Sequence, residues 1–178
     1  MPEAKTPRQV LEAFYQAEKI YMQAKASGEE ASFDDIAVTL DPAVVLHQSP
    51  DLPFGREYVG HDQYEQWANT MSSIFDRLEV AEQQWFEGSE VVVVVCRFKT
   101  HSRRNDSYQD LPMAQVVTVK GGKITDFGLS IGTCLPTSML HGRSNAESVG
   151  VNRLHAAARH CGEDQLARIG FYNGQPSL

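Results

Sequence analysis

The spacing of apolar residues changes along the chain, from a helical period in its first part to a period of two later on. Thr6, Pro7 and Gln9 form a capping-box pattern, which predicts a helix that begins near residue 7. The apolar face of this helix recurs every three or four positions, at Val10, Phe14, Ala17 and Tyr21. A second, shorter helix is predicted from Ser32, and a third from Asp62. The third helix carries an aromatic inner face: Tyr64, Trp67 and Met71.

From Leu78 onward apolar and polar residues alternate, which predicts strands. The predicted strands after the third helix cover residues 78–86, 90–101, 112–120 and 123–133. Gly121 and Gly122 suit a two-residue type I′ turn between the last two strands, and a longer polar loop is expected over 102–110. A further strand is predicted earlier, over 43–49, followed by an irregular Pro/Gly-rich segment over 50–60. Hairpin connections predict an antiparallel meander.

Composition limits the classes of partner. The chain has 178 residues, of which 42% are hydrophobic and 22% charged, a mixture typical of a globular domain. Its net charge of −7 argues against a nucleic-acid partner. No apolar run approaches the roughly 20 residues that cross a membrane. Three cysteines without paired spacing, and an N-terminus without the apolar core of a secretory leader, predict reduced thiols and a cytoplasmic location.

The residues from Val91 to Val95 are apolar on both faces of their strand. Such strands are usually covered on both sides. The helices would cover one face, and a second copy of the chain is expected to cover the other, so the sequence predicts a homodimer.

Two consecutive motifs carry a family resemblance: Leu46-His47-Gln48-Ser49-Pro50, and Leu52-Pro53-Phe54-Gly55 before the Gly60 that opens the third helix. They resemble the SnoaL-like, ketosteroid-isomerase-like branch of the nuclear transport factor 2-like fold. The resemblance implies an α+β fold of the cystatin-like type: a cone-shaped, curved antiparallel sheet with N-terminal helices over its concave face. This SnoaL-like α+β barrel domain would cover 1–137. Residues 138–178 would form a C-terminal helical extension that packs on the domain or on the dimer partner.

The sequence departs from the family pattern in the last strand. Several relatives place an aspartate there as the catalytic base, whereas the segment from Gly128 to Cys134 contains no carboxylate. The base of the family therefore cannot be transferred to this chain.

His47 is the strongest candidate for a replacement base, because histidine alone has an ordinary pKa near neutral pH. Its alternative role is to cap the strand end through a backbone carbonyl. The hydroxyl of Tyr64 could bind a substrate oxygen, although core aromatics are equally common. Gln115 lies in an otherwise apolar strand, where a buried amide needs a hydrogen-bond partner. The sequence does not determine which face of the sheet Gln115 occupies. The expected substrate pocket is lined by Phe14, Trp67, Met71, Trp85, Phe98 and Met113.

No metal ligand set is expected, because His155 and His160 are five residues apart rather than the four of a helical zinc pair. No cofactor is expected either. Two functions remain open. One is a cofactor-free isomerase, cyclase or dehydratase that acts by acid–base catalysis on a small apolar carbonyl compound, polyketide-like or steroid-like. The other is a non-catalytic small-molecule-binding or dimeric interaction protein on the same fold.

Overall fold

Six strands form one sheet in the order β2-β1-β6-β5-β4-β3. The computed structural model describes residues 5–48 and 54–131. The helices are α1 (Pro7–Ala26), α2 (Asp34–Ala37) and α3 (Gly60–Ile74), and the strands are β1 (Leu40–His47), β2 (Glu57–Val59), β3 (Phe75–Glu87), β4 (Val91–Ser102), β5 (Ser107–Lys120) and β6 (Lys123–Ile131). The antiparallel meander predicted for β3 to β6 is confirmed, whereas β1 joins β6 in parallel.

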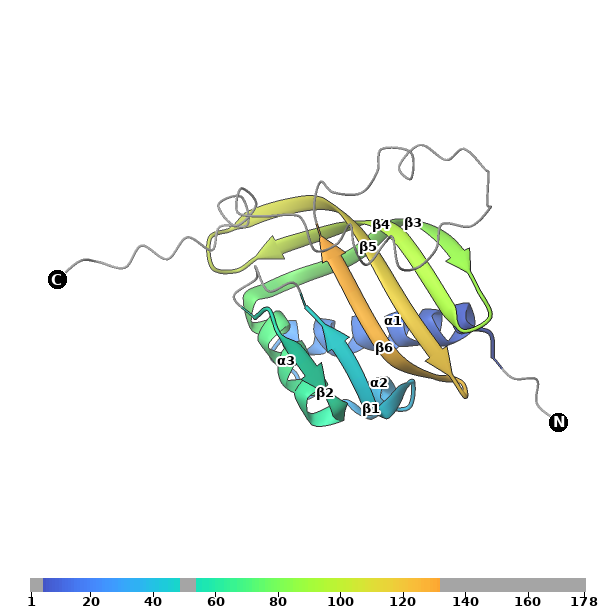
Figure 1. Cartoon of the computed structure of the whole chain (residues 1–178). Helices are drawn as coiled ribbons and strands as arrows, with labels where there is room; N and C mark the ends of the chain where they lie inside the picture. Colours follow the sequence, from blue (N-terminus) through green and yellow to red (C-terminus); the bar gives the residue numbers. More distant parts are fainter. Residues whose placement is uncertain (1–4, 49–53, 132–178) are drawn as a thin grey trace.

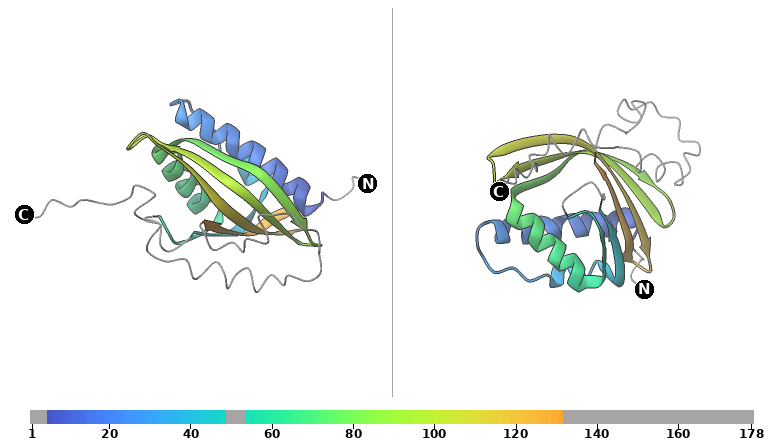
Figure 2. Two further views of the ribbon diagram at one scale, coloured as in Figure 1. Left: turned by 90° about the horizontal axis from the view of Figure 1, so that it is seen from above. Right: turned by 60° about the vertical axis from the view of Figure 1, so that its left-hand side comes forward.

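The sheet bends around α1 and α3, which lie together on its concave side (Figures 1 and 2). Two irregularities contribute to this curvature: the register of β3 on β4 shifts between Ala81 and Gln84, and that of β5 on β6 shifts after Thr118. Glu82, in the first shift, has a φ of 52°. Bulges of this kind bend a strand and increase its twist. The α+β architecture, with helices on one face of a curved sheet, is confirmed.

The first helix begins as its sequence predicts. The Thr6 hydroxyl accepts from the Gln9 backbone N–H at 3.2 Å, and the Gln9 side chain accepts from the Thr6 N–H at 2.9 Å. The third helix begins at Gly60, two residues earlier than predicted. Gly60 has a φ of +78°, and a Cβ there would lie 3.2 Å from the Pro42 carbonyl oxygen, so the close approach of β1 and α3 requires glycine.

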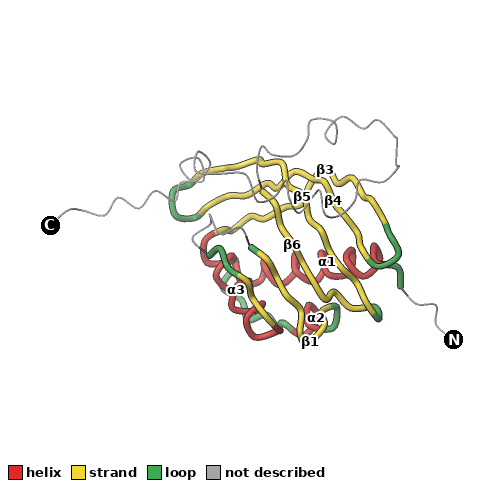
Figure 3. Tube along the Cα trace, in the orientation of Figure 1, coloured by secondary structure: helices red, strands yellow, loops and turns green. Residues whose placement is uncertain are grey.

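Strands β3 and β5 begin earlier than the sequence predicts, at Phe75 and Ser107, and both run as long strands in Figure 3. The loop expected over 102–110 is wrong, because β5 already begins at Ser107. Its polar residues pair across the hairpin, as when Arg97 binds the Asp110 carboxylate at 2.8 Å. The prediction failed because polar side chains, which are typical of loops, here belong to the part of the hairpin that extends beyond the core. The Gly121-Gly122 turn is confirmed, since both residues have the positive φ that a type I′ turn needs.

The predicted C-terminal extension over 138–178, and the end of the last predicted strand, lie outside the described residues. Within the described part of the chain, no helix combines the length and the apolar character needed to cross a membrane.

Candidate functional site

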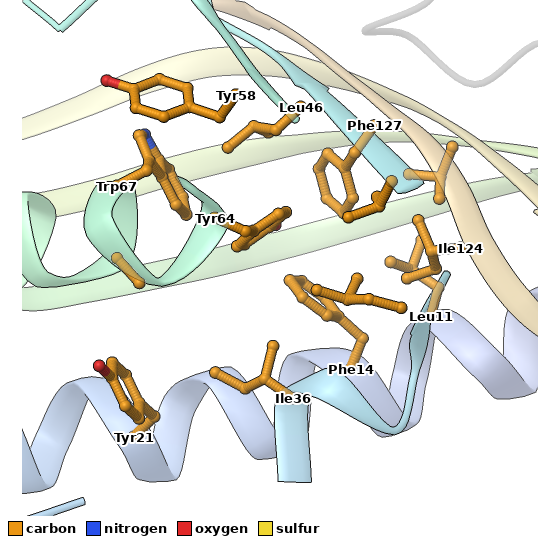
Figure 4. Packing of buried hydrophobic residues seen from close by; sticks show 14 of the residues in the cluster. Leu11, Phe14, Tyr21, Ile36, Leu46, Tyr58, Tyr64, Trp67, Ile124 and Phe127 are labelled. Carbon is orange, nitrogen blue, oxygen red and sulfur yellow. The ribbon is translucent and has the colours of Figure 1, made fainter. Parts of the chain in front are cut away.

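A cavity of about 720 Å³ lies between the two long helices and the concave face of the sheet. This volume is within the range of small-molecule sites. Among the predicted site residues, Tyr64, Trp67, Met71, Phe98, Met113 and Gln115 line it. The structure does not place Phe14 or Trp85 on its wall. Phe14 is fully buried in the core, where its ring contacts those of Tyr64 and Phe127 (Figure 4), and Trp85 packs against Tyr15 and Arg8.

Gln115 faces the cavity from β5 and is buried there. Its amide oxygen accepts a hydrogen bond from the hydroxyl of Tyr15 on α1. The partner that a buried amide requires is thus another cavity residue. Burial raises the pKa of Tyr15 far above its ordinary value of 10.0, so the phenol keeps its proton.

Glu18 is the titratable group on the cavity wall that the sequence analysis missed. It follows Tyr15 by three residues, so both side chains project from the same face of α1. Burial raises the pKa of Glu18 from 4.5 to about 7. No described residue forms a hydrogen bond or an ion pair with its carboxyl group. Glu18 is therefore a half-buried carboxyl group that is close to half-protonated at neutral pH.

The sequence did contain a signal for Glu18. Leu11, Tyr15, Glu18 and Met22 recur at spacings of four, three and four, which makes Glu18 a charged residue within an apolar helical face. A carboxylate in such a position is desolvated when the face is buried, and perturbed pKa values are concentrated at functional sites.

Tyr64 completes a cluster of three polar groups. It is almost fully buried at 1% exposure, and its pKa is raised first by burial and then by the nearby Glu18 and Tyr15 groups. The Glu18 charge also raises the pKa of Tyr15. The carboxyl group and the two hydroxyls therefore lie within electrostatic reach of one another. The Tyr64 hydroxyl has no hydrogen-bond partner among the described residues.

The expectation that His47 shares a cavity with Tyr64 is wrong. Side chains alternate along β1, so the buried Leu46 faces the core while His47 points to the opposite face of the sheet. There its Nδ1 lies 3.0 Å from Glu57 and its Nε2 lies 2.8 Å from Asp126. The next residue, Gln48, lines the cavity. His47 is thus held between two carboxylates outside the site, and we do not assign it as the base.

The described residues contain no group of three or more His, Cys, Asp or Glu side chains placed to hold a metal ion. Away from the exposed charged residues at its rim, the polar chemistry of the cavity rests on the Glu18 carboxyl group, two phenols and neutral amide, indole and hydroxyl groups.

Comparison with known structures identifies the fold. An NTF2-like protein from Burkholderia xenovorans has a TM-score of 0.61 at 14% identity, over 74% of this chain and 94% of its own. An NTF2-like protein from Burkholderia thailandensis has a TM-score of 0.58 at 19% identity, over 78% and 99%. A Jannaschia protein assigned as a SnoaL-like polyketide cyclase has a TM-score of 0.51 at 15% identity, over 67% and 85%. Structural likeness at such identities establishes the fold and not the reaction.

No curated protein matches the chain. The family profile of the SnoaL-like domain matches residues 21–127, a range that includes Tyr64 and Gln115 and begins after Tyr15 and Glu18. The chain therefore belongs to the SnoaL-like domain family.

Proposed function

We propose that the chain is a cofactor-free enzyme that moves a proton on carbon next to a carbonyl group, as an isomerase, cyclase or dehydratase of a small apolar substrate. The observation that carries this proposal is the Glu18 carboxyl group, whose pKa is about 7 in the cavity that also holds Tyr15 and Tyr64. A general base works best when its pKa is near the working pH. The carboxylate and carboxylic acid forms of Glu18 are then both available for proton transfer.

In this mechanism the Glu18 carboxylate removes a proton from the carbon beside the substrate carbonyl. The electron pair of the broken C–H bond moves into the carbonyl group, which becomes an enolate oxygen. Glu18, now protonated, returns the proton to a different carbon in an isomerisation. In a cyclase the enolate carbon attacks a second carbonyl instead, and the oxygen of that carbonyl takes the proton from Glu18 as it becomes a hydroxyl group. In a dehydratase the enolate expels a β-hydroxyl group, which takes the proton from Glu18 and leaves as water.

Tyr64 and Gln115 are proposed to stabilise the enolate oxygen. The Tyr64 hydroxyl is uncommitted among the described residues, so it can donate to that oxygen. Gln115 uses its amide oxygen to accept from Tyr15, which leaves its N–H groups as a second donor. Tyr15 thereby positions the amide rather than contacting the substrate. Donors fixed in place before the reaction stabilise a developing oxyanion without reorganisation.

The compound 5-nitrobenzisoxazole tests the base without knowledge of the natural substrate. A carboxylate removes the C3–H proton of its isoxazole ring, the N–O bond breaks, and a coloured cyanophenolate forms in one step. We expect catalysis above the buffer rate, with kcat/KM rising with pH through about 7 because only ionised Glu18 accepts a proton. Glu18→Gln keeps the shape and should lower kcat/KM by about 10²–10⁴-fold.

Glu12→Gln is the matched control, because Glu12 is a carboxylate on the same helix that lies at the exposed rim of the cavity and pairs with Arg8. It should leave kcat/KM nearly unchanged. Equal activity of Glu18→Gln and the native chain would contradict the proposal.

Binding without catalysis is the second candidate function, and a separate observation favours it: the cavity has buried polar atoms without partners, which indicate a ligand whether or not a reaction follows. If carbonyl compounds bind in the cavity while no proton-transfer substrate is turned over, this function replaces the first.

A homodimer is proposed on the outer face of the sheet. There Phe86 of β3 is half exposed beside Val93 of β4, and Val116 of β5, opposite Val93, is partly exposed. An apolar strip of this kind favours a partner surface. Sedimentation at tens of micromolar should give the mass of two chains, and a monomer would contradict the assignment.

A further inference from the structure

Three buried polar side chains line the cavity and leave an atom without a hydrogen-bond partner in the described part of the chain: Gln48 (Nε2), Trp67 (Nε1) and Thr100 (Oγ1). Their exposures are 7%, 6% and 3%, so these atoms have also lost most of their contact with solvent. Buried polar groups in native proteins nearly always have a partner. All three side chains line the cavity, so a molecule bound there can supply the missing partners.

The three side chains lie at different places along the cavity. Gln48 follows His47, which pairs with Gly128 of β6, so by register it lies level with Gln115, two strands away. Gln115 pairs with Val94 across the sheet, and Thr100 lies six positions further along β4. At about 3.3 Å per residue, Thr100 is roughly 20 Å further along the strand than the Tyr15–Gln115 pair. Trp67 lies one turn beyond Tyr64 on α3 and also contacts its ring edge to face (Figure 4). Thr100 therefore lies far along β4 from the acid–base groups, whereas Trp67 adjoins Tyr64 and Gln48 lies two strands from Gln115.

The chemistry of the three groups defines what they can bind. The amide nitrogen of Gln48 and the indole nitrogen of Trp67 can only donate a hydrogen bond, and the Thr100 hydroxyl can donate or accept. Their shared ligand must therefore offer acceptor atoms. The positively charged residues on this cavity, Lys19 and Arg77, are exposed at its rim and cannot neutralise an anion bound deep inside. Neutral donors in an apolar environment suit a neutral oxygen.

We propose that the substrate is a dicarbonyl-type molecule: beyond its reacting carbonyl it carries a second, neutral carbonyl oxygen, which Gln48 and Trp67 bind. This inference rests on the proposed function for the reacting end and adds the specificity-determining residues for the distal end. A site built around hydrogen-bond donors discriminates against an analogue without the acceptor, because the buried donors then stay unpaired.

Two naphthalene ketones of nearly the same shape test the proposal by equilibrium dialysis with the full chain. The first, 2,6-diacetylnaphthalene, has a carbonyl at each end. In the second, 2-acetyl-6-isopropylnaphthalene, a CH–CH₃ unit replaces one C=O. We expect the diketone to bind at least about tenfold more tightly, which exceeds the factor of two due to its symmetry and corresponds to one or two satisfied hydrogen bonds.

The variants Gln48→Met and Trp67→Phe remove the donors while retaining most of the side-chain volume, and Thr100→Val does the same for the hydroxyl. In the Gln48→Met/Trp67→Phe double variant the affinity ratio of the two ketones should fall to about two. Gln16→Met is the matched control, since Gln16 lines the same cavity but is exposed. It should leave the ratio unchanged. The melting temperatures of the unliganded Gln48→Met and Thr100→Val variants should not fall, because each loses an unpaired buried group.

Glu18→Gln separates this proposal from the proposed function, because it abolishes proton transfer but should preserve the affinity ratio. If the affinity ratio of the two ketones is about two in the native chain, the distal subsite is overturned. It is also overturned if the double variant has the same affinity ratio as the native chain. A failure of the diketone to bind up to its solubility limit also overturns it. Loss of 5-nitrobenzisoxazole turnover alone leaves the subsite standing and removes only the catalytic proposal.

Discussion

The two faces of the sheet differ in whether their polar side chains have partners. On the outer face His47 lies between Glu57 and Asp126, and His101 lies between Asp76 and Asp106, so both ring nitrogens of each histidine have a carboxylate partner. On the concave face, Glu18 and the Tyr64 hydroxyl have no such partner among the described residues. A partnered group stabilises the fold, whereas an unpartnered buried group costs stability.

This difference locates the site better than residue type does. Histidine is the residue most often associated with catalysis at neutral pH. Here, however, the described histidines with two carboxylate partners lie outside the cavity, and a glutamate carries the titration near pH 7 inside it. Burial without a partner, rather than intrinsic pKa, identifies the candidate base.

Tyr64→Phe gives the largest effect that we expect from a single hydroxyl on the concave face. The ring stays packed against Phe14 and Trp67, while the donor to the enolate oxygen is lost. We expect kcat/KM for 5-nitrobenzisoxazole to fall by about 10²-fold, mostly in kcat, because the donor acts on charge that develops in the transition state. An unchanged kcat would show that Tyr64 is only a core aromatic.

Tyr15→Phe tests the Tyr15–Gln115 pair on the cavity wall. Removing the Tyr15 hydroxyl leaves the buried Gln115 amide oxygen without its donor, which should lower the free energy of unfolding by about 1–3 kcal/mol. In the background of Gln115→Leu the same substitution should lower the free energy of unfolding much less, because no amide oxygen remains to lose its donor. A double-mutant cycle followed by urea denaturation measures the difference. Additive effects would mean that the two groups do not interact.

The sequence predicted the elements of the fold well, and for identifiable reasons. The capping box at Thr6, the aromatic face of α3 and the Gly121-Gly122 turn are local signals, and the structure confirms each. The three-residue strand β2 was missed because it lies in a Pro/Gly-rich segment and exists only through its pairing with β1. Short strands depend on tertiary partners and carry little local signal.

The site was harder to predict, because it depends on which way each side chain faces. A shift of one position on β1 separates His47, on the outer face, from Gln48, on the cavity. A family motif identifies the segment, but it does not determine which of its side chains face the cavity. Glu18 could be missed for a different reason: its desolvation arises from the sheet and α3, which pack over α1 only in the folded chain.

The outer face offers a pH-dependent prediction. The Asp76 and Asp106 carboxylates raise the pKa of His101 above its ordinary value of 6.5, so the folded state binds the His101 proton more tightly than the unfolded state does. The resulting stability is complete below pH 6.5, as long as both carboxylates remain ionised, and is lost as the pH rises through the higher folded-state pKa. The melting temperature of His101→Asn relative to the native chain should therefore be lowest near pH 5.5 and should approach the native value at alkaline pH. A difference that does not depend on pH would contradict this origin.

The smallest expected effect on activity is that of His47→Ala, and it decides between the two faces most directly. His47 is 40% exposed and contacts two partly exposed carboxylates. Since surface ion pairs contribute at most about 1 kcal/mol, its loss should lower stability only slightly. Because its ring lies on the opposite side of β1 from the cavity, kcat/KM for 5-nitrobenzisoxazole should stay within about twofold of the native value, whereas removal of a base would lower it by 10² or more. A large loss of kcat in His47→Ala, with the fold intact by circular dichroism, would place the base on the outer face and remove Glu18 from that role.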